Sequence, residues 1–325
     1  MSVQDSEIRW GILGGGKVVE SKSGPCFNIP GRSRVAAVCR RDAENASATA
    51  ERLGANLVLN QLEDMVESDE VQAVYIATPP GLHHSQAMVC LNARKPVYIE
   101  KPFTTSAAQA EELVRNFAEV GIPLFVAHYR RALPKFREIK SLIETQIGQP
   151  LEFSFRLKRR LQNDVAHPWM YDRELSGGGK FFDIAPHCVD LLLFLFGDVD
   201  QMSAEAKHWK APQGSEDCVT LNFRFKSGVL GTANFNFLAW DKEDRMSVHG
   251  EKGILEFSVH GNEPSTLRLP DGKVRQFFHT VPELIEGPMI EEVVAFLRGE
   301  EGKPCMGQDA VPVIELIESA ARSLH

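Results

Sequence analysis

Four short apolar runs in the first hundred residues constrain the fold more than any other feature of the sequence. Turn-forming residues bound each of them: RWGIL (9–13), RVAAVC (34–39), AVYIAT (73–78) and PVYIEK (96–101). Between the last three lie two helix-like stretches, AENASATAERLG and GLHHSQAMVCLNA. Uninterrupted apolar strands that alternate with helices are typical of a parallel sheet covered on both faces. The pattern predicts an α/β chain that begins with a doubly wound nucleotide-binding domain.

The length of the chain and the end of this alternation predict a second domain. A chain of 325 residues exceeds what one hydrophobic core usually sustains. After about Leu124, strand-like runs follow one another with short turns, among them LEFSFRLK, VTLNFRF and VLGTANFNF. Such spacing predicts antiparallel pairing. We therefore expect one domain over residues 1–124 and another over residues 125–325.

Charge, cysteine content and hydropathy exclude several classes of protein. The formal net charge of -8 argues against a protein that binds nucleic acid by neutralising phosphates, and the basic run RLKRRL (156–161) is interpreted as a solvated face. The six cysteines include no C-x-x-C pair, which favours reduced thiols and a cytoplasmic protein. The apolar run LLLFLF is far shorter than the roughly 18 residues of a membrane span. We expect neither nucleic acid nor membrane as a partner.

A glycine-rich turn, GILGGGKVV (11–19), follows the first apolar run. Its backbone amides and the positive end of a following helix could hold a diphosphate. Gly14 and Gly16 match the first two glycines of the dinucleotide fingerprint, although Val19 stands where a third small residue is expected. We expect the cofactor to contact Gly14, Gly16, Lys17 and Val18.

Two alternatives remain open for this turn. A Walker A loop would use Gly11, Gly16 and Lys17, but Val18 lacks the hydroxyl that would hold magnesium. A tight turn without any ligand is the other alternative. Gly24 and Pro25 fall where the first helix should continue, so that helix is expected to be short or broken.

The residues after the second run bear on which nucleotide binds. An acidic side chain there accepts hydrogen bonds from a ribose hydroxyl, whereas arginine pairs with a 2'-phosphate. The chain has Arg40 and Arg41 at this point, and Asp42 comes one position too late. The sequence therefore favours NADP over NAD, against the alternative that both arginines are merely solvated.

Three motifs in order, YIATPPGLHH, YIEKPF and SGGGKFFDIAPHCVD, resemble the glucose-fructose oxidoreductase, inositol dehydrogenase and MocA-like (Gfo/Idh/MocA) family over nearly the whole chain. The resemblance implies an N-terminal Rossmann domain and a C-terminal α/β domain with a large, mostly antiparallel open sheet. It also implies an NAD(P)-dependent dehydrogenase that forms a homodimer or homotetramer through that sheet.

The same resemblance assigns three catalytic residues. Lys101 would hydrogen-bond the reacting oxygen and stabilise its developing negative charge. His187 would accept the proton in oxidation and donate it in reduction. Asp183, four residues before His187, could orient a substrate hydroxyl, although an Asp here could equally cap a helix. The resemblance further implies a cis peptide bond between Lys101 and Pro102.

Other residues would surround these three. The resemblance places Thr78, Pro79, Pro80 and His83 beside the cofactor, and Glu100 could orient Lys101 or the cofactor amide. Residues 177–179 are glycines that could let backbone approach the cofactor or form a flexible loop. Candidates for the substrate wall are Tyr129, Arg130, Trp169 and Tyr171. No histidine or cysteine spacing indicates a metal site.

The expected reaction is reversible hydride transfer between a nicotinamide and a secondary alcohol or carbonyl of a sugar, polyol or dihydrodiol. Met170 stands where the family usually has an arginine, which disfavours substrates that carry a phosphate or carboxylate. Two alternatives differ in kind: a non-catalytic NADP-binding regulatory protein, and a redox-assisted glycoside-modifying enzyme that retains its cofactor.

Overall fold

The computed structural model describes residues 7–16, 18–160, 168–210 and 215–323, and it divides the chain into two compact units. Unit 1 comprises residues 1–132 and 282–314, and unit 2 comprises residues 133–281 and 315–325. Residues 125–132 and 282–314 thus pack with the N-terminal part, unlike in the continuous division after residue 124 that the sequence suggested. The functional assignment of domains 1–124 and 125–325 remains a prediction.

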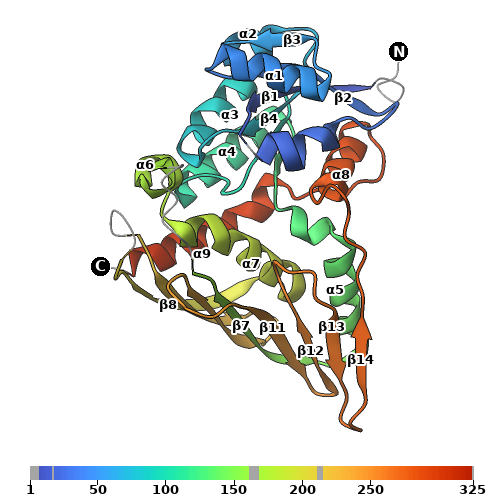
Figure 1. Cartoon of the computed structure of the whole chain (residues 1–325), viewed down its shortest axis with the longest axis vertical. Helices are drawn as coiled ribbons and strands as arrows, with labels where there is room; N and C mark the ends of the chain where they lie inside the picture. Colours follow the sequence, from blue (N-terminus) through green and yellow to red (C-terminus); the bar gives the residue numbers. More distant parts are fainter. Residues whose placement is uncertain (1–6, 17, 161–167, 211–214, 324–325) are drawn as a thin grey trace. The chain divides into compact units, whose positions relative to one another are not determined.

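Unit 1 is built on a six-stranded sheet in the order β3-β2-β1-β4-β5-β6. Strands β1 to β4 of it are labelled in Figure 1. Every neighbouring pair in the sheet is parallel. The strands are β1 (Ile8–Gly14), β2 (Ser33–Cys39), β3 (Leu57–Leu59), β4 (Ala73–Ala77), β5 (Val97–Ile99) and β6 (Leu124–Val126). This order confirms the predicted doubly wound Rossmann fold, whose direction of strand addition reverses between β1 and β4.

Two of the helices of unit 1, α1 and α4, begin at a side-chain cap and end at a left-handed glycine. Its α-helices are α1 (Ala43–Leu53), α2 (Leu62–Glu67), α3 (His83–Asn92), α4 (Ala107–Val120) and α8 (Gly287–Leu297). The Ser106 side chain accepts from Gln109 N at the start of α4, and Gly121 ends that helix at φ 71°. The segment after β1 is short, as predicted: a π-helical turn η2 (Val19–Ser23) passes into the 3₁₀ helix η3 (Gly24–Phe27).

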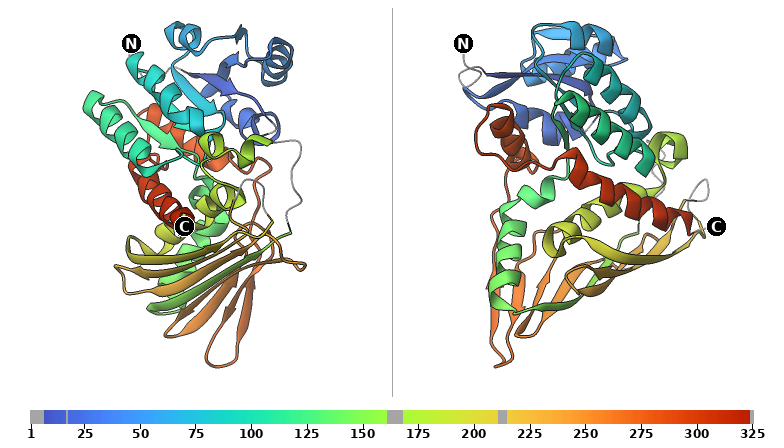
Figure 2. Two further views of the ribbon diagram at one scale, coloured as in Figure 1. Left: turned by 90° about the vertical axis from the view of Figure 1, so that its left-hand side faces the viewer. Right: turned by 180° about the vertical axis from the view of Figure 1, so that it is seen from behind.

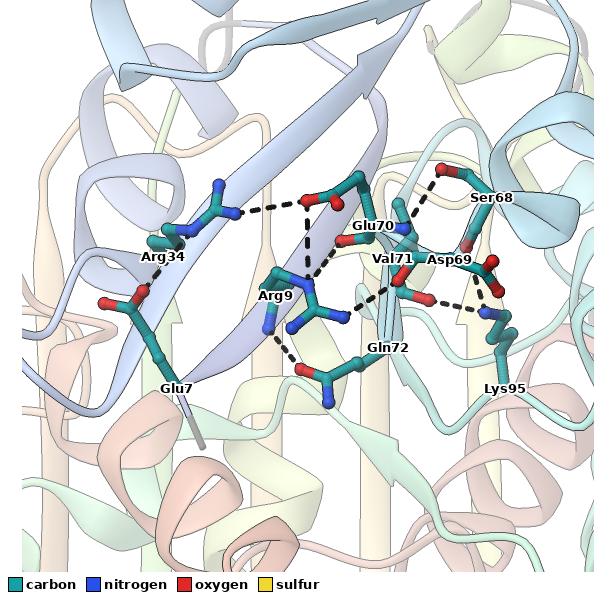
Figure 3. Close-up of polar contacts among 9 residues, drawn as sticks. All are labelled: Glu7, Arg9, Arg34, Ser68, Asp69, Glu70, Val71, Gln72 and Lys95. Carbon is teal, nitrogen blue, oxygen red and sulfur yellow. Dashed lines mark hydrogen bonds and ion pairs between the residues drawn. The ribbon is translucent and has the colours of Figure 1, made fainter. Parts of the chain in front are cut away.

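The amino ends of the unit 1 strands carry a polar network (Figure 3). The Arg9 guanidinium donates to the carbonyls of Asp69, at 2.8 Å, and of Glu70, at 3.1 Å. Lys95, just before β5, donates to the carbonyls of Ser68, at 3.2 Å, and Val71, at 2.5 Å. These bonds satisfy backbone oxygens of the segment between α2 and β4, so basic side chains at this edge serve the fold.

Unit 2 contains an eight-stranded sheet in the order β14-β13-β12-β11-β7-β10-β9-β8. Its strands are β7 (Pro150–Lys158), β8 (Val199–Lys207), β9 (Cys218–Phe225), β10 (Leu230–Asn236), β11 (Glu243–Gly250), β12 (Gly253–Phe257), β13 (Ser265–Arg268) and β14 (Val274–Phe277). Only the β10–β7 pair in it is parallel. The prediction of a large, mostly antiparallel sheet is confirmed.

Two helices of unit 2, α5 (Pro134–Gln146) and α7 (Lys180–Phe196), lie on one face of this sheet (Figure 2). Aromatic contacts bind α7 to it: the ring centroids of Phe181 and Phe235 are 5.3 Å apart, and those of Phe153 and Phe196 are 5.4 Å apart. On α5, the ring centroid of Phe136 lies 6.4 Å from that of Phe257 on β12. Because side chains alternate along a strand, Arg156 and Arg245 point to the other face. There Arg156 pairs with Glu243 at 3.8 Å.

Three further helices are η6 (Pro168–Tyr171), α6 (Arg173–Ser176) and α9 (Gly307–Arg322). All six cysteines fall in the described ranges, where they are free thiols and all but Cys218 are buried. Within those same ranges, no helix combines the length and hydropathy that crossing a bilayer requires.

Candidate functional site

The glycine-rich turn lies at the carboxyl ends of β1 and β4, where the strand order reverses. Gly14 has φ 99°, and a Cβ there would come within 2.5 Å of the Ala77 carbonyl oxygen. This position therefore requires glycine for both conformation and space. Gly16 is exposed, and no described atom beyond its chain neighbours lies within 4 Å of an ideal Cβ on it. Gly16 thus borders open space among the described residues, at the edge where such folds bind ligands.

Arg40, the residue after β2, lies against this turn. A Cβ on Gly15 would be 2.6 Å from Arg40 Cδ. The guanidinium donates to Thr49 Oγ1 at 2.6 Å and to Glu20 Oε1 at 3.2 Å. It is therefore held in place by neighbouring side chains rather than freely solvated.

The other residues predicted near the nucleotide occupy different settings. Val18 and Arg41 are exposed, and Lys17 lies outside the described residues. Asp42 caps α1, because its carboxylate accepts a hydrogen bond from Asn45 N at 2.8 Å. This carboxylate is thus engaged by the helix, which agrees with its position one residue too late for a ribose.

His83 braces the segments after β4 and β5. Its ring is completely buried, with Nε2 2.8 Å from the Thr78 carbonyl oxygen and Nδ1 3.1 Å from that of Pro102. Burial lowers the pKa of His83, which favours the neutral imidazole. Pro79 precedes the short helix η4 (Pro80–Leu82), and the buried Pro80 begins it. His83 thus connects the backbone after β4 with the backbone after β5.

Lys101 follows β5 at the same edge, and the Lys101–Pro102 bond is cis, as the resemblance implied. The Glu100 carboxylate beside it accepts from Tyr75 Oη at 2.6 Å and from Lys101 N at 3.1 Å. Tyr75 Oη also lies 3.0 Å from Ser23 Oγ. Burial raises the pKa of Glu100, while the Lys101 charge opposes that rise. Glu100 therefore orients the backbone at Lys101.

A second carboxyl group lies in this part of unit 1. Glu286, just before α8, is 3% exposed, and burial followed by the Glu100 charge raises its pKa well above the usual range. Tyr98 is fully buried. Burial, and after it the charges of Glu286 and Glu100, raise its pKa. Two like charges in one buried place disfavour each other. The Lys22 charge, and after it that of Lys101, oppose the rise in the pKa of Glu286.

The predicted substrate-wall residues are divided between the two units. Tyr129 and Arg130 belong to η5 (Tyr129–Ala132) in unit 1, with the guanidinium carbon 5.3 Å from the Tyr129 ring centroid. Burial raises the pKa of Tyr129. Trp169 lies in η6 of unit 2 and is 37% exposed. Tyr171 ends η6, and its side chain lies outside the described part.

In unit 2, α7 carries both Asp183 and His187. The helix begins at Lys180 with Gly179 as its N-cap, and Asp183 N donates to the Gly179 carbonyl at 3.2 Å. Asp183 is therefore inside the first turn and is not the N-cap. Because residues four apart share a helix face, Asp183 and His187 lie on one side of α7. Asp190 is buried further along the same helix.

The loop of Gly177, Gly178 and Gly179 is packed by the protein's own side chains. A Cβ on Gly177 would lie 2.4 Å from the Phe182 ring, and one on Gly179 would lie 2.3 Å from Ser215 Cβ. The buried Glu216 follows Ser215, and Arg173 lies 3.6 Å from its carboxylate. The start of α7 is thus fixed by the segment before β9.

The sequence prediction missed two groups. Glu286 lies in PELIEGP, which matches no motif, and only its burial beside Glu100 singles it out. His260, in the segment between β12 and β13, has its ring centroid 5.8 Å from that of His187. No spacing in the sequence links these two histidines. Among the described residues, no group of three or more His, Cys, Asp or Glu is placed to hold a metal ion.

Comparison with known proteins gives two family matches that together cover most of the chain. Residues 8–128 match the oxidoreductase family with an NAD-binding Rossmann fold, and residues 136–256 match the Gfo/Idh/MocA C-terminal domain. These matches define an NAD(P)-dependent oxidoreductase with a Rossmann N-terminal domain.

Individual relatives agree with the family matches. Oxidoreductase P35 of Formosa agariphila is 34% identical over 319 residues, which cover 97% of this chain and 98% of the relative. The 1,5-anhydro-D-fructose reductase of Ensifer adhaerens is 29% identical over 254 residues, or 76% of this chain and 74% of the relative. A levoglucosan dehydrogenase solved with NADH and levoglucosan has a similar fold, with a TM-score of 0.85 at 21% identity over 98% of each chain. The chain belongs to the Gfo/Idh/MocA oxidoreductase family.

Proposed function

We propose that this oxidoreductase reversibly transfers a hydride between NADP and a secondary alcohol or carbonyl of a sugar, polyol or dihydrodiol. The observation that carries the proposal is the setting of Lys101. This lysine follows a central strand at the nucleotide-binding edge, its backbone is held by Glu100, and buried carboxyl groups lie nearby. A cation placed this way suits the stabilisation of a developing alkoxide. The 29% identity to a relative named 1,5-anhydro-D-fructose reductase supports the sugar class.

The proposal gives each polar residue one task. The nicotinamide, when bound, accepts or supplies the hydride. Lys101 donates a hydrogen bond to the reacting oxygen, and His187 takes or returns the hydroxyl proton. Asp183, on the same face of α7 as His187, orients a substrate hydroxyl. Tyr129, Arg130, Trp169 and Tyr171 are proposed to line the substrate.

The turn residues fit a dinucleotide, and the proposal places its diphosphate at Gly14 and Gly16, with Lys17 and Val18 beyond them. Thr78, Pro79, Pro80 and Glu100 are proposed to flank the nicotinamide half. His83 would act indirectly, since its ring is buried against backbone carbonyls. Arg40 supports NADP, because its guanidinium is held over Gly15 by Thr49 and Glu20. Arg41, which is exposed, is proposed as a second contact of the 2'-phosphate.

An oligomer that pairs the open sheet faces of unit 2 is part of the same proposal. The ion pairs on that face, such as Arg156 with Glu243 and Arg268 with Glu256, give it a polar character. A homodimer or homotetramer would therefore associate through rows of charged side chains on this sheet face. Sedimentation at several salt concentrations measures the oligomeric state.

One assay tests the proposed reaction. Purified protein is mixed with NADP or NAD and a panel of sugars, polyols and dihydrodiols, and absorbance of the reduced nicotinamide is recorded. We expect turnover with NADP at lower cofactor concentration than with NAD. Replacing Lys101→Ala should lower kcat by about 10²–10³, and His187→Ala by about 10²–10⁴, with cofactor affinity nearly unchanged.

A matched control lies at the other end of the same strand. Lys95 precedes β5 and bonds only to backbone carbonyls in the contacts described above, so Lys95→Ala should keep the wild-type kcat. Full activity of both Lys101→Ala and His187→Ala would refute the assignment. Cofactor binding without turnover of any substrate would favour the regulatory alternative, and glycoside cleavage without net NADPH formation would favour the glycoside-modifying one.

A further inference from the structure

Glu20, on η2, pairs with two arginines of unit 1. Its Oε1 lies 3.2 Å from Arg40 Nη1, and its Oε2 lies 3.4 Å from Nη1 of Arg52 on α1. The Arg40 side chain is 17% exposed and that of Arg52 is 56% exposed, so solvent screens the second pair more strongly than the first. Within the described ranges, Glu20 is the only carboxylate that pairs with Arg40. One anion therefore balances the charge of Arg40, and it lies on the segment that follows the glycine turn.

The Arg40 guanidinium forms its hydrogen bonds through one of its three nitrogens. Nη1 donates to Thr49 Oγ1 at 2.6 Å, to Glu20 Oε1 at 3.2 Å and to the Asn45 carbonyl at 3.4 Å. Nη2 and Nε make no hydrogen bond within the part of the chain that the structure describes. A guanidinium carries five N–H donors in a planar fork that matches a phosphate. Arg40 thus keeps donors for a further anion, while Thr49 and Asn45 anchor Nη1.

Both members of the Arg40–Glu20 pair lie beside the glycine turn. An ideal Cβ on Gly15 would come within 2.6 Å of Arg40 Cδ and 2.8 Å of Arg40 Nε. Glu20 N donates to the Gly16 carbonyl at 3.1 Å, so Glu20 lies in the first turn after the glycines. The proposed function places the diphosphate of the cofactor at this turn and its 2'-phosphate on Arg40. A phosphate that binds Arg40 meets a carboxylate already paired with it, and two anions near one cation repel each other.

We propose that Glu20 is a specificity-determining residue: its carboxylate competes with the 2'-phosphate of NADP for Arg40 and narrows the difference in affinity between NADP and NAD. The proposal rests on the proposed function, because it takes Arg40 as the contact of that phosphate. NAD carries a hydroxyl in place of the phosphate, so it does not compete with Glu20 for Arg40. Because Thr49 and Asn45 also hold Nη1, the guanidinium keeps its place when Glu20 loses its charge. The charge of Glu20 rather than its hydrogen bond therefore sets the discrimination.

The test compares two dissociation constants in the absence of substrate. Wild-type protein and Glu20→Gln are each titrated with NADPH and with NADH, and the fluorescence of the reduced nicotinamide is recorded. Both cofactors carry the same diphosphate, so the ratio of the Kd for NADH to the Kd for NADPH isolates the contribution of the 2'-phosphate. Glu20→Gln keeps the size and one acceptor oxygen of the side chain. The ratio should rise by about threefold to fivefold in this variant, the size expected of a partly exposed charge pair.

Two controls assign the effect to the Arg40–Glu20 pair. Glu51→Gln removes the same charge from an exposed position of α1 and should leave the ratio near its wild-type value. Adding Glu20→Gln to Arg40→Ala should not raise the ratio above that of Arg40→Ala alone, because the group that Glu20 balances is gone. Circular dichroism checks that each variant is folded. An unchanged or lower ratio in Glu20→Gln, or an equal rise in the absence of Arg40, would overturn the proposal.

Salt and turnover separate this proposal from other causes. Raising the salt concentration should reduce the difference in ratio between wild type and Glu20→Gln, because ions screen partly exposed charges. A difference that does not depend on salt indicates a steric cause and overturns the proposal. If the ratio rises as expected but no sugar, polyol or dihydrodiol is converted, the role of Glu20 stands and the proposed reaction fails separately. If a substrate is converted while the ratio does not change, only the role of Glu20 is overturned.

Discussion

The tetrapeptide Gly-Gly-Gly-Lys occurs twice in this chain, at 14–17 and at 177–180, and the two copies need their glycines for different reasons. In the first, a Cβ added to Gly14 would overlap with the backbone oxygen of Ala77, whereas one added to Gly16 would face open space among the described residues. In the second, a Cβ added to Gly177 would overlap with the ring of Phe182, and one added to Gly179 would overlap with Ser215. The first copy therefore has open space on one side, whereas side chains of the protein itself occupy the space around the second.

This difference teaches that a glycine run near a site is not by itself a ligand cradle. The sequence left open whether residues 177–179 approach the cofactor or form a flexible loop. In the structure, Gly177 is at φ 82° at the end of α6, and its N–H donates to the Arg173 carbonyl at 2.9 Å. The loop is packed and sets the first turn of α7, and with it Asp183.

The largest loss of stability is expected from a substitution at Gly14. In Gly14→Ala, the methyl group would meet a backbone oxygen that cannot turn aside, and the positive φ adds about 1–3 kcal/mol of strain. We expect a lower free energy of unfolding and a strong loss of NADP affinity, measured by denaturant titration and by cofactor fluorescence. Wild-type values for both quantities would show that β1 and β4 can separate here.

An intermediate loss of stability is expected from a substitution at Gly179. The added methyl in Gly179→Ala would overlap with Ser215, and overpacking of this kind costs about 1–3 kcal/mol. Removing the opposing Cβ with Ser215→Gly should recover much of this loss, so the double variant should be more stable than Gly179→Ala alone. A double-mutant cycle on the free energy of unfolding measures the coupling. Simple additivity would argue against the contact.

The smallest effect on stability is expected at Gly16. With open space around it, Gly16→Ala should change the free energy of unfolding by less than about 0.5 kcal/mol. If a diphosphate occupies that space, the same methyl should weaken NADP binding. Titration of wild type and variant with NADP compares the two effects. Unchanged affinity would mean that the open side of the first glycine run is not used by the cofactor.

Much of unit 1 could be predicted from sequence because its strands are contiguous apolar runs with turn residues at both ends. The position of Lys101 at the nucleotide edge followed from that order alone. The return of residues 282–314 to unit 1 could not be predicted, since a helix such as α8 carries no signal of which sheet it will cover. Glu286 was missed for the same reason.

The candidate site was predictable only where its residues are close in sequence. Asp183 and His187 are four residues apart, and the motif around them suggested a shared helix face. The capping alternative for Asp183 failed to hold because the helix begins earlier, at Lys180. The backbone N–H of His260 donates to Asp244, and Lys135, more than a hundred residues away in the sequence, donates to the nearby Ser258 and Gly261. Such bonds leave no periodic trace in the sequence.

The cysteines of this fold have a practical consequence for spectroscopy. Burial raises the pKa of Cys26 and Cys90 to about 12 and that of Cys39 to about 11, and Cys188 and Cys305 are buried as well. The thiolate is the nucleophile that attacks a maleimide, so at neutral pH these groups react slowly. Burial also raises the pKa of Cys218, which is only half-buried. A single cysteine placed at an exposed position, for instance by Trp240→Cys at a site 89% exposed, can carry a dye or spin label with the native thiols left in place.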